Sequence, residues 1–129
     1  MNQQLVQIAL VVKDYDEAIS FYTQKLGFEL IEDTKLTETK RWVVVKPKGS
    51  GSCSLLLAKA VNEEQQRAIG NQTGGRVFLF LHTDNIERDY QHLKMNDVKF
   101  ARELSEEPYG TVAVFEDLYG NLWDLIQPK

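Results

Sequence analysis

Residues 7–28 of the chain read QIALVVKDYDEAISFYTQKLGF, and this stretch decides the fold. Its first six residues alternate between bulky apolar side chains and a mixed set that includes Gln7, as in a strand with one face toward a core. Asp14 has the short acceptor side chain of a helix N-cap, and Gly27 is typical of the residue that ends a helix. The sequence therefore predicts a strand over residues 5–12, followed by a helix that ends at Gly27.

The same order of elements occurs twice along the chain. After the first helix, alternating or β-branched stretches predict three strands, and a short helix capped by Asn62 follows them. The pattern then restarts with a strand over residues 77–83 and a helix capped by Asn85, and three more strands complete it. The six strands that follow the two long helices are predicted at residues 28–34, 42–45, 53–58, 98–103, 111–116 and 122–127.

This repeat predicts an α+β protein of two β-α-β-β-β modules whose curved mixed sheets surround a cleft. Residues 1–61 form the first module, residues 62–75 a connecting helix and linker, and residues 76–129 the second module. Each module has one long helix, which can cover only one face of its four strands. The other face must be covered by the partner module or must enclose a ligand.

Composition narrows the classes of function. The chain has 129 residues with a net charge of −4, which gives no electrostatic attraction to a phosphate backbone, so we expect no nucleic-acid partner. Cys53 is the only cysteine, so no intramolecular disulfide forms. The first residues lack the pattern of a signal peptide, and no apolar run approaches the roughly 20 residues that span a bilayer. We therefore expect a cytoplasmic protein without a membrane partner.

Both ends of the chain resemble one known family. The run from Gln7 to Asp14, with the following Phe21-Tyr22 and Leu26-Gly27-Phe28, resembles the opening of the vicinal-oxygen-chelate superfamily, which includes glyoxalases, bleomycin-resistance proteins and extradiol dioxygenases. The closing stretch FEDLYGNLWDL, residues 115–125, is similar to the superfamily's last turn and strand, although Leu118 stands where a proline is common. The resemblance implies paired modules around a cleft, and by analogy a homodimer.

The resemblance also implies four positions for ligands of a divalent metal, one on the first strand and one on the last strand of each module. Here these positions are Gln7, Leu55, Phe78 and Asp124. Gln7 and Asp124 carry oxygen donors, whereas Leu55 and Phe78 do not. A divalent metal and its absence are therefore both compatible with the sequence.

Other side chains qualify as parts of a site. Asp124 lies between apolar neighbours, which favours either a cleft-facing ligand or base, or a hydrogen-bonded structural carboxylate. Gln7 is either a polar group of a pocket wall or an amide satisfied by the backbone. His82 shares a strand face with Phe78 about 13 Å away, too far to replace it as a ligand but able to act as an acid, a base or a structural residue. The residues expected to contact an aromatic substrate are Trp42, Phe78, Phe80 and Tyr109.

Three hypotheses follow for the function. The first is a lyase, isomerase or dioxygenase type of enzyme that acts on a small carbonyl or diol compound, with Asp124 and His82 as its catalytic groups. The second is a metal-free protein that sequesters a drug-like compound, as the resemblance to bleomycin-resistance proteins implies. The third is a dimeric scaffold without chemistry, against which the polar residues among the apolar ones argue.

Overall fold

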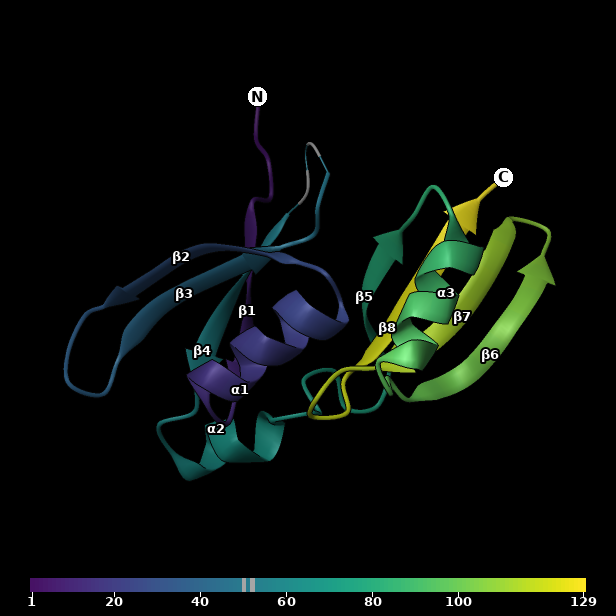
Figure 1. Ribbon diagram of the computed structural model, residues 1–129. Helices are drawn as coiled ribbons and strands as arrows, with labels where there is room; N and C mark the ends of the chain where they lie inside the picture. Colours follow the sequence, from purple (N-terminus) through teal and green to yellow (C-terminus); the bar gives the residue numbers. More distant parts are fainter. Residues whose placement is uncertain (50, 52) are drawn as a thin grey trace. The chain divides into compact units, whose positions relative to one another are not determined.

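The computed structural model describes residues 1–49, 51 and 53–129. The chain divides into two compact units, residues 1–69 and 70–129, and each unit contains one four-stranded sheet. The elements of the two units follow the same order, which confirms the predicted α+β class and the repeated β-α-β-β-β pattern (Figure 1).

The first unit holds a mixed sheet with the strand order β1-β4-β3-β2. Strand β1 runs parallel to β4, and the other neighbouring pairs are antiparallel. The elements of this unit are β1 (Gln7–Val12), α1 (Tyr15–Ser20), η1 (Phe21–Lys25), β2 (Glu29–Lys35), β3 (Arg41–Lys46), β4 (Ser54–Lys59) and α2 (Glu63–Ala68).

The second unit repeats this topology with the strand order β5-β8-β7-β6. Strand β5 is parallel to β8, and the remaining pairs are antiparallel. Its elements are β5 (Val77–His82), α3 (Ile86–Met95), β6 (Phe100–Glu107), β7 (Gly110–Glu116) and β8 (Leu122–Pro128). Strand β6 extends beyond the predicted end at residue 103, as the two halves of the β6–β7 hairpin continue pairing to Glu107 and Gly110.

The core of the first unit lies between α1 and one face of its sheet. Helix α1 packs on β3 and β4, as Figure 1 shows. The helix begins at the predicted cap, where the Asp14 carboxylate accepts a hydrogen bond of 2.9 Å from the backbone N–H of Glu17. The fully buried side chains of this unit come from the helix and from alternate positions on three strands: Leu10, Val12, Ala18, Tyr22, Val43, Val45 and Leu57.

The first long helix does not remain α-helical up to Gly27 as predicted. It changes to a π-helix at Phe21, and the backbone N–H of Leu26 donates to the carbonyl of Phe21, five residues back. The wider turn places the consecutive aromatic residues Phe21 and Tyr22 both in the core, where they are 7% and 0% exposed. Gly27 follows with the expected positive φ of 76°.

The core of the second unit is aromatic. Phe115 on β7 and Trp123 on β8 are register partners, and their rings stack with centroids 5.7 Å apart. Phe100 packs edge-on against Phe115, and Tyr90 of α3 packs against Phe100 with centroids 4.8 Å apart. Helix α3 therefore covers one face of the sheet through a chain of rings, as well as through its buried Ile86 and Leu93.

A buried network of hydrogen bonds fixes the turn between β7 and β8. One oxygen of Asp117 accepts from the backbone N–H groups of Tyr119, Gly120 and Asn121 at 3.1, 3.0 and 2.9 Å. Its other oxygen accepts from the side-chain amide of Asn121 at 3.0 Å, and the amide oxygen of Asn121 accepts from the backbone N–H of Gln72. The turn thereby sets where β8, which carries Asp124, begins.

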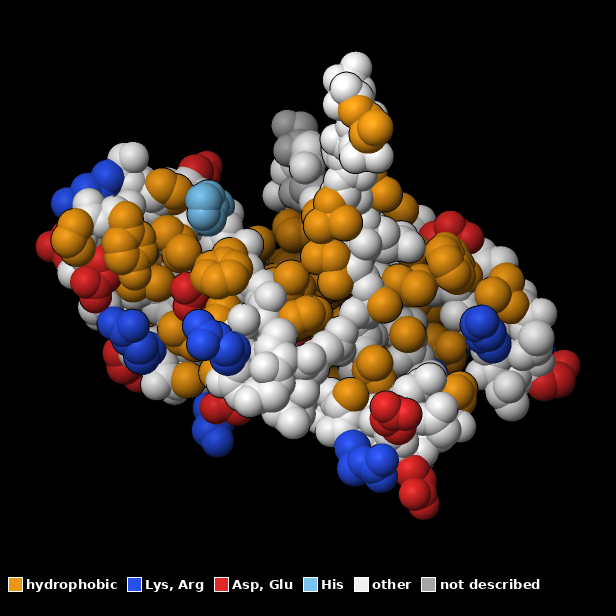
Figure 2. All heavy atoms as spheres, turned by 180° about the vertical axis from the view of Figure 1, so that it is seen from behind, with side chains coloured by type: hydrophobic (Ala, Val, Ile, Leu, Met, Phe, Trp, Pro, Cys, Tyr) orange, Lys and Arg blue, Asp and Glu red, His pale blue; other side chains and the backbone are white. Residues whose placement is uncertain are grey.

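Each sheet keeps one face that its long helix does not cover. The view from behind shows hydrophobic side chains gathered on these open faces, with few charged groups among them (Figure 2). Within the part of the chain that the structure describes, no helix is both long enough and apolar enough to cross a membrane.

Candidate functional site

A row of four side chains crosses the open face of the second sheet. The strand register aligns Arg102 of β6 with Val114 of β7, Val114 with Asp124 of β8, and Asp124 with Phe80 of β5. Residues directly opposite each other on neighbouring strands project from the same face. Because Trp123 next to Asp124 belongs to the helix-covered core, the row lies on the other face of the sheet.

Phe80 is the aromatic end of this row. Its side chain is 64% exposed, which is unusual for a phenylalanine in the middle of a strand. His82 lies two residues further along the same strand, is exposed, and is aligned with Ile126. The structure therefore places the predicted residues Phe80, His82 and Asp124 on one face of one sheet.

Asp124 is a carboxylate in an apolar part of this face. Its neighbours on the same face of β8 are Leu122 and Ile126. The loss of hydration on burial raises the pKa of Asp124 above its usual range, and the positive charge of Arg102 offsets part of that effect. Among the residues that the structure describes, none donates a hydrogen bond to this carboxylate or forms an ion pair with it, so its oxygens keep their acceptor capacity for a ligand.

Arg102 is a charged residue of this face that the sequence analysis did not single out. Its guanidinium donates to Glu107 at 3.3 Å and is two strands away from Asp124. Strand β6 has two register irregularities, on either side of Arg102, so alternation alone does not assign a face to its residues. The sequence contains no other signal that shows which face of the sheet Arg102 lies on.

The open face of the first sheet carries Gln7 and Trp42. Gln7 is aligned with Ser54, and its side-chain amide donates to the Ser54 hydroxyl at 3.2 Å, which in turn donates to the carbonyl of Val6. Trp42 alternates with the fully buried Val43 and so projects from the face opposite the helix; its contact with a ligand stays a prediction. The Gln7 amide is thus partly engaged in fixing the strand edge.

Leu55 is not the last-strand counterpart of Asp124. It is aligned with Ile8 and Val45 on the helix-covered face and is only 3% exposed. Leu56, which is aligned with Ala9, occupies the corresponding position on the open face. A shift of one residue along a strand moves a side chain to the opposite face. The prediction of Leu55 instead of Leu56 therefore placed this position on the wrong face of the sheet.

The residues at the four family positions do not fit a metal centre held by three or four protein ligands. Leu56 and Phe78 present hydrocarbon side chains, which cannot coordinate a cation. The two remaining positions offer the neutral amide of Gln7, which already contacts Ser54, and the single carboxylate of Asp124. The described residues also contain no group of three or more His, Cys, Asp or Glu side chains arranged to hold a metal ion.

Two of the predicted substrate contacts lie at the margins of the second sheet. Tyr109 is 57% exposed in the short turn that joins β6 to β7, and its carbonyl accepts a hydrogen bond from the N–H of Lys129. Phe78 lies where the β5–β8 register shifts between Val77 and Leu79, so it has no directly opposite residue.

Two open mixed sheets of the same topology, each with one covering helix, define a protein of paired β-α-β-β-β modules. The family model of the Glyoxalase/Bleomycin resistance protein/Dioxygenase superfamily matches residues 4–125. The chain therefore belongs to this superfamily, as its two ends had indicated.

Relatives of similar length support this assignment. A protein of Shewanella frigidimarina is 63% identical over 128 residues, covering 98% of this chain and 95% of the relative. The uncharacterized protein YurT of Bacillus subtilis is 30% identical over 128 residues, covering 96% of this chain and 98% of that protein.

Solved structures show the same fold. UcmS2 is 33% identical with a TM-score of 0.85, and the match covers 98% of both chains. TnmS3, an antibiotic binding protein from Streptomyces sp. CB03234, is 28% identical with a TM-score of 0.78 over 99% of this chain and 98% of its own. The fosfomycin resistance protein FosX of Listeria monocytogenes shares the fold at 14% identity and a TM-score of 0.72.

Proposed function

We propose that this protein binds an aromatic small molecule on its open sheet faces and sequesters it. The observation that carries the proposal is the row in which the exposed ring of Phe80 stands beside Asp124. Binding sites for organic molecules are mostly apolar, with a few placed polar groups that fix orientation, and this row has that composition. The similarity to TnmS3, whose name states antibiotic binding, supports the same class of ligand.

The proposal is tested with the purified full chain and a panel of aromatic antibiotics. We expect at least one compound to raise the melting temperature, because a ligand at 100 times its Kd adds about 2.7 kcal/mol to stability. Equilibrium dialysis with mass spectrometry should then recover the compound unchanged. A compound that is recovered chemically altered would contradict sequestration.

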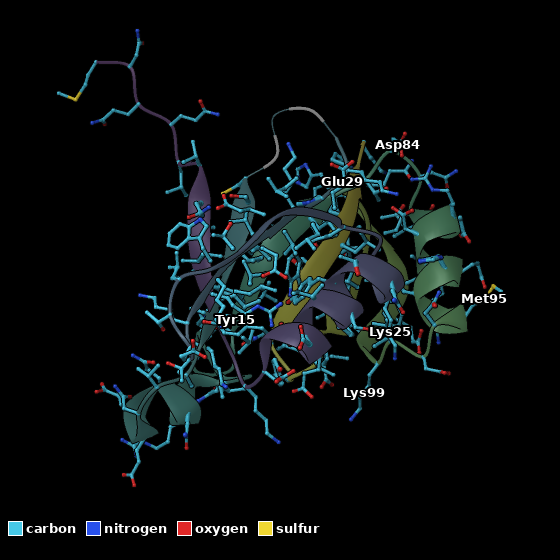
Figure 3. All side chains as sticks on the ribbon, turned by 60° about the vertical axis from the view of Figure 1, so that its left-hand side comes forward. Tyr15, Lys25, Glu29, Asp84, Met95 and Lys99 are labelled. Carbon is cyan, nitrogen blue, oxygen red and sulfur yellow. The ribbon has the colours of Figure 1, made fainter. Side chains whose placement is uncertain are left out.

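Phe80→Ala should weaken binding of such a compound about tenfold or more, since burying a phenylalanine ring contributes about 1.5–3 kcal/mol. Met95→Ala is the matched control. Met95 is 82% exposed and projects from α3 away from the sheet (Figure 3), so its removal should leave the affinity unchanged. Equal losses in both variants would remove the Phe80 site from consideration.

An enzyme that uses Asp124 as a general base is the second candidate. The raised pKa of Asp124 favours this role, since a base whose pKa lies nearer neutrality accepts a proton more readily. Metal analysis of protein purified without chelator separates the candidates. A stoichiometric metal that is lost in both Gln7→Ala and Asp124→Ala would favour a metal-assisted enzyme over the binding protein.

A further inference from the structure

We propose that the site on the second sheet selects ligands that carry a protonated amine on an aromatic body, with Asp124 as the counter-ion and Phe80 as the ring beside it. This inference rests on the function proposed above and names the class of ligand. It follows from the charge, the surroundings and the partners of Asp124, and from the position of Phe80.

Asp124 has an acceptor that the second sheet leaves unused. Leu122 and Ile126 flank it on its own strand, and Val114 lies opposite it on β7, so hydrocarbon surrounds the carboxylate on three sides. A carboxylate in such surroundings is poorly hydrated and gains more from an added cation than a fully hydrated one. Within the described part of the chain, no donor lies within hydrogen-bond or ion-pair distance of it.

Phe80 occupies the fourth side and is suited to the same charge. It is directly opposite Asp124 across the parallel β5–β8 pair, where neighbouring strands are about 4.8 Å apart. A ring face attracts an ammonium or a guanidinium group, and this attraction adds to that of a nearby carboxylate. The pair therefore favours an ammonium group over a neutral or an anionic one, and the exposed ring offers a surface for the ligand's aromatic body.

Other charges on the face do not reverse this preference. Arg102 is two strand spacings from Asp124, about 9.6 Å between backbones, and its guanidinium contacts Glu107. Glu116 is aligned with Leu122 and adds a second carboxylate to the same face. The competing inference, that Arg102 binds an anionic ligand, is included as an outcome of the test.

The experiment compares three probes of equal size by NMR titration of the full chain: 1-naphthylmethylamine, 1-naphthylmethanol and 1-naphthoate. We expect the amine to bind about tenfold more tightly than the alcohol, because a charge-assisted hydrogen bond contributes about 1.5–3 kcal/mol. Asp124→Asn should reduce the affinity for the amine by the same factor and leave that for the alcohol unchanged. Asp124→Ser is a second neutral variant should the asparagine disturb folding.

Glu106→Gln is the matched control. It removes one negative charge from β6, where Glu106 is exposed and aligned with Thr111. Its affinity for the amine should equal that of the wild type, which separates a local effect of Asp124 from a change in net charge.

Each remaining outcome overturns the inference in a recognisable way. Equal affinities for the amine and the alcohol, or an unchanged amine affinity in Asp124→Asn, overturn the amine preference and leave the proposed binding function intact. Tighter binding of the naphthoate assigns the site to anions through Arg102 instead. If none of the probes and none of the aromatic antibiotics binds, the proposed function fails and the inference fails with it.

Discussion

At the scale of single residues, Asp117 and Asn121 hold the turn between β7 and β8 through buried hydrogen bonds. Both are buried, at 5% and 3% exposure, and together they accept four backbone N–H groups. Asp117→Ala leaves three of these donors and the Asn121 side chain without their acceptor. We expect a loss of about 3 kcal/mol in the free energy of unfolding, measured by urea denaturation.

A swap of the two residues provides the control. Asp117→Asn keeps one acceptor oxygen but turns an NH₂ group toward the side-chain amide of Asn121. In the double variant Asp117→Asn with Asn121→Asp, the new amide donates to the new carboxylate and all the hydrogen bonds can form again. The double variant should therefore be more stable than Asp117→Asn alone, and the reverse order would contradict this account of the turn.

The raised pKa of Asp124 predicts how the stability of the protein depends on pH. Because burial raises this pKa above the ordinary value of 3.8, the folded protein binds more protons than the unfolded chain between the two pKa values. The contribution of Asp124 to stability is therefore greatest below pH 3.8 and declines as the pH rises through the folded pKa. Asp124→Asn should accordingly have a higher melting temperature than the wild type at pH 7 and lose that advantage toward pH 3.

Measuring melting temperatures of both proteins from pH 3 to pH 8 checks this. Arg102, His82 and Glu116 lie on the same face, but they are present in both proteins, so their titration largely cancels in the difference. Curves that run parallel at all pH values would show that Asp124 is not desolvated. A stabilised variant that no longer binds the amine probe would mean that the site is maintained at a cost in stability.

Sequence reasoning at this scale succeeded where the signal is local. The caps at Asp14, Asn62 and Asn85 were predicted because a cap is defined by a side chain and an N–H three residues away. It failed at Leu55, because assigning the face of a residue needs a register with other strands. No spacing within one strand shows that register.

At the scale of elements, the segment before β5 comes very close to the turn before β8 at Gly70. Gly70 has φ +73°, and a Cβ at this position would overlap the carbonyl of Tyr119. Gly74 has a similar φ of +69° but has nothing within 4 Å of such a Cβ. An alanine at either position would therefore suffer the same backbone strain, but only at Gly70 would it also overlap another segment.

We expect Gly74→Ala to cost about 1 kcal/mol, the strain of a left-handed alanine, and Gly70→Ala to cost at least about 2 kcal/mol more. Chemical denaturation of the two variants measures the difference. Equal losses would show that the segment can move away from Tyr119 at little cost, and that this contact does not position the turn.

The eight strands and the helical segments of the described residues were all predicted as elements, because hydrophobic periodicity and turn residues mark them along the chain. What the sequence did not show were the departures from regular geometry. These are the π-helical turn at Phe21 and the register irregularities in β2, β5 and β6, which no local residue pattern marks. These departures also decide which side chains of β6 lie on the open face of the sheet.

At the scale of the whole molecule, the chain consists of two units with separate cores. Each sheet ends at the first strand of its module, β1 or β5, whose outer edge has no partner within its own described sheet. A free strand edge can pair with another chain, so the homodimer expected from the family stays a prediction, to be measured by sedimentation equilibrium. The cleft between modules that the sequence predicted is likewise still a prediction, as is the cytoplasmic location.

The separate cores support one further prediction, which compares two buried residues of different units. Leu57 in the first unit and Phe115 in the second are both 0% exposed. Leu57 is aligned with Val43 of its own unit, and the ring of Phe115 contacts Phe100 and Trp123 of its own unit. Leu57→Ala and Phe115→Ala should each cost about 3–4 kcal/mol, from lost burial and the cavity left behind.

The two variants should differ in which strands become less protected from amide hydrogen exchange. Because each substitution weakens one core, amide hydrogen exchange read by mass spectrometry should accelerate most in β1, β3 and β4 for Leu57→Ala. For Phe115→Ala it should accelerate most in β6, β7 and β8. A uniform acceleration along the chain in both variants would mean instead that the two units open only together, and that the repeated modules fold as one cooperative body.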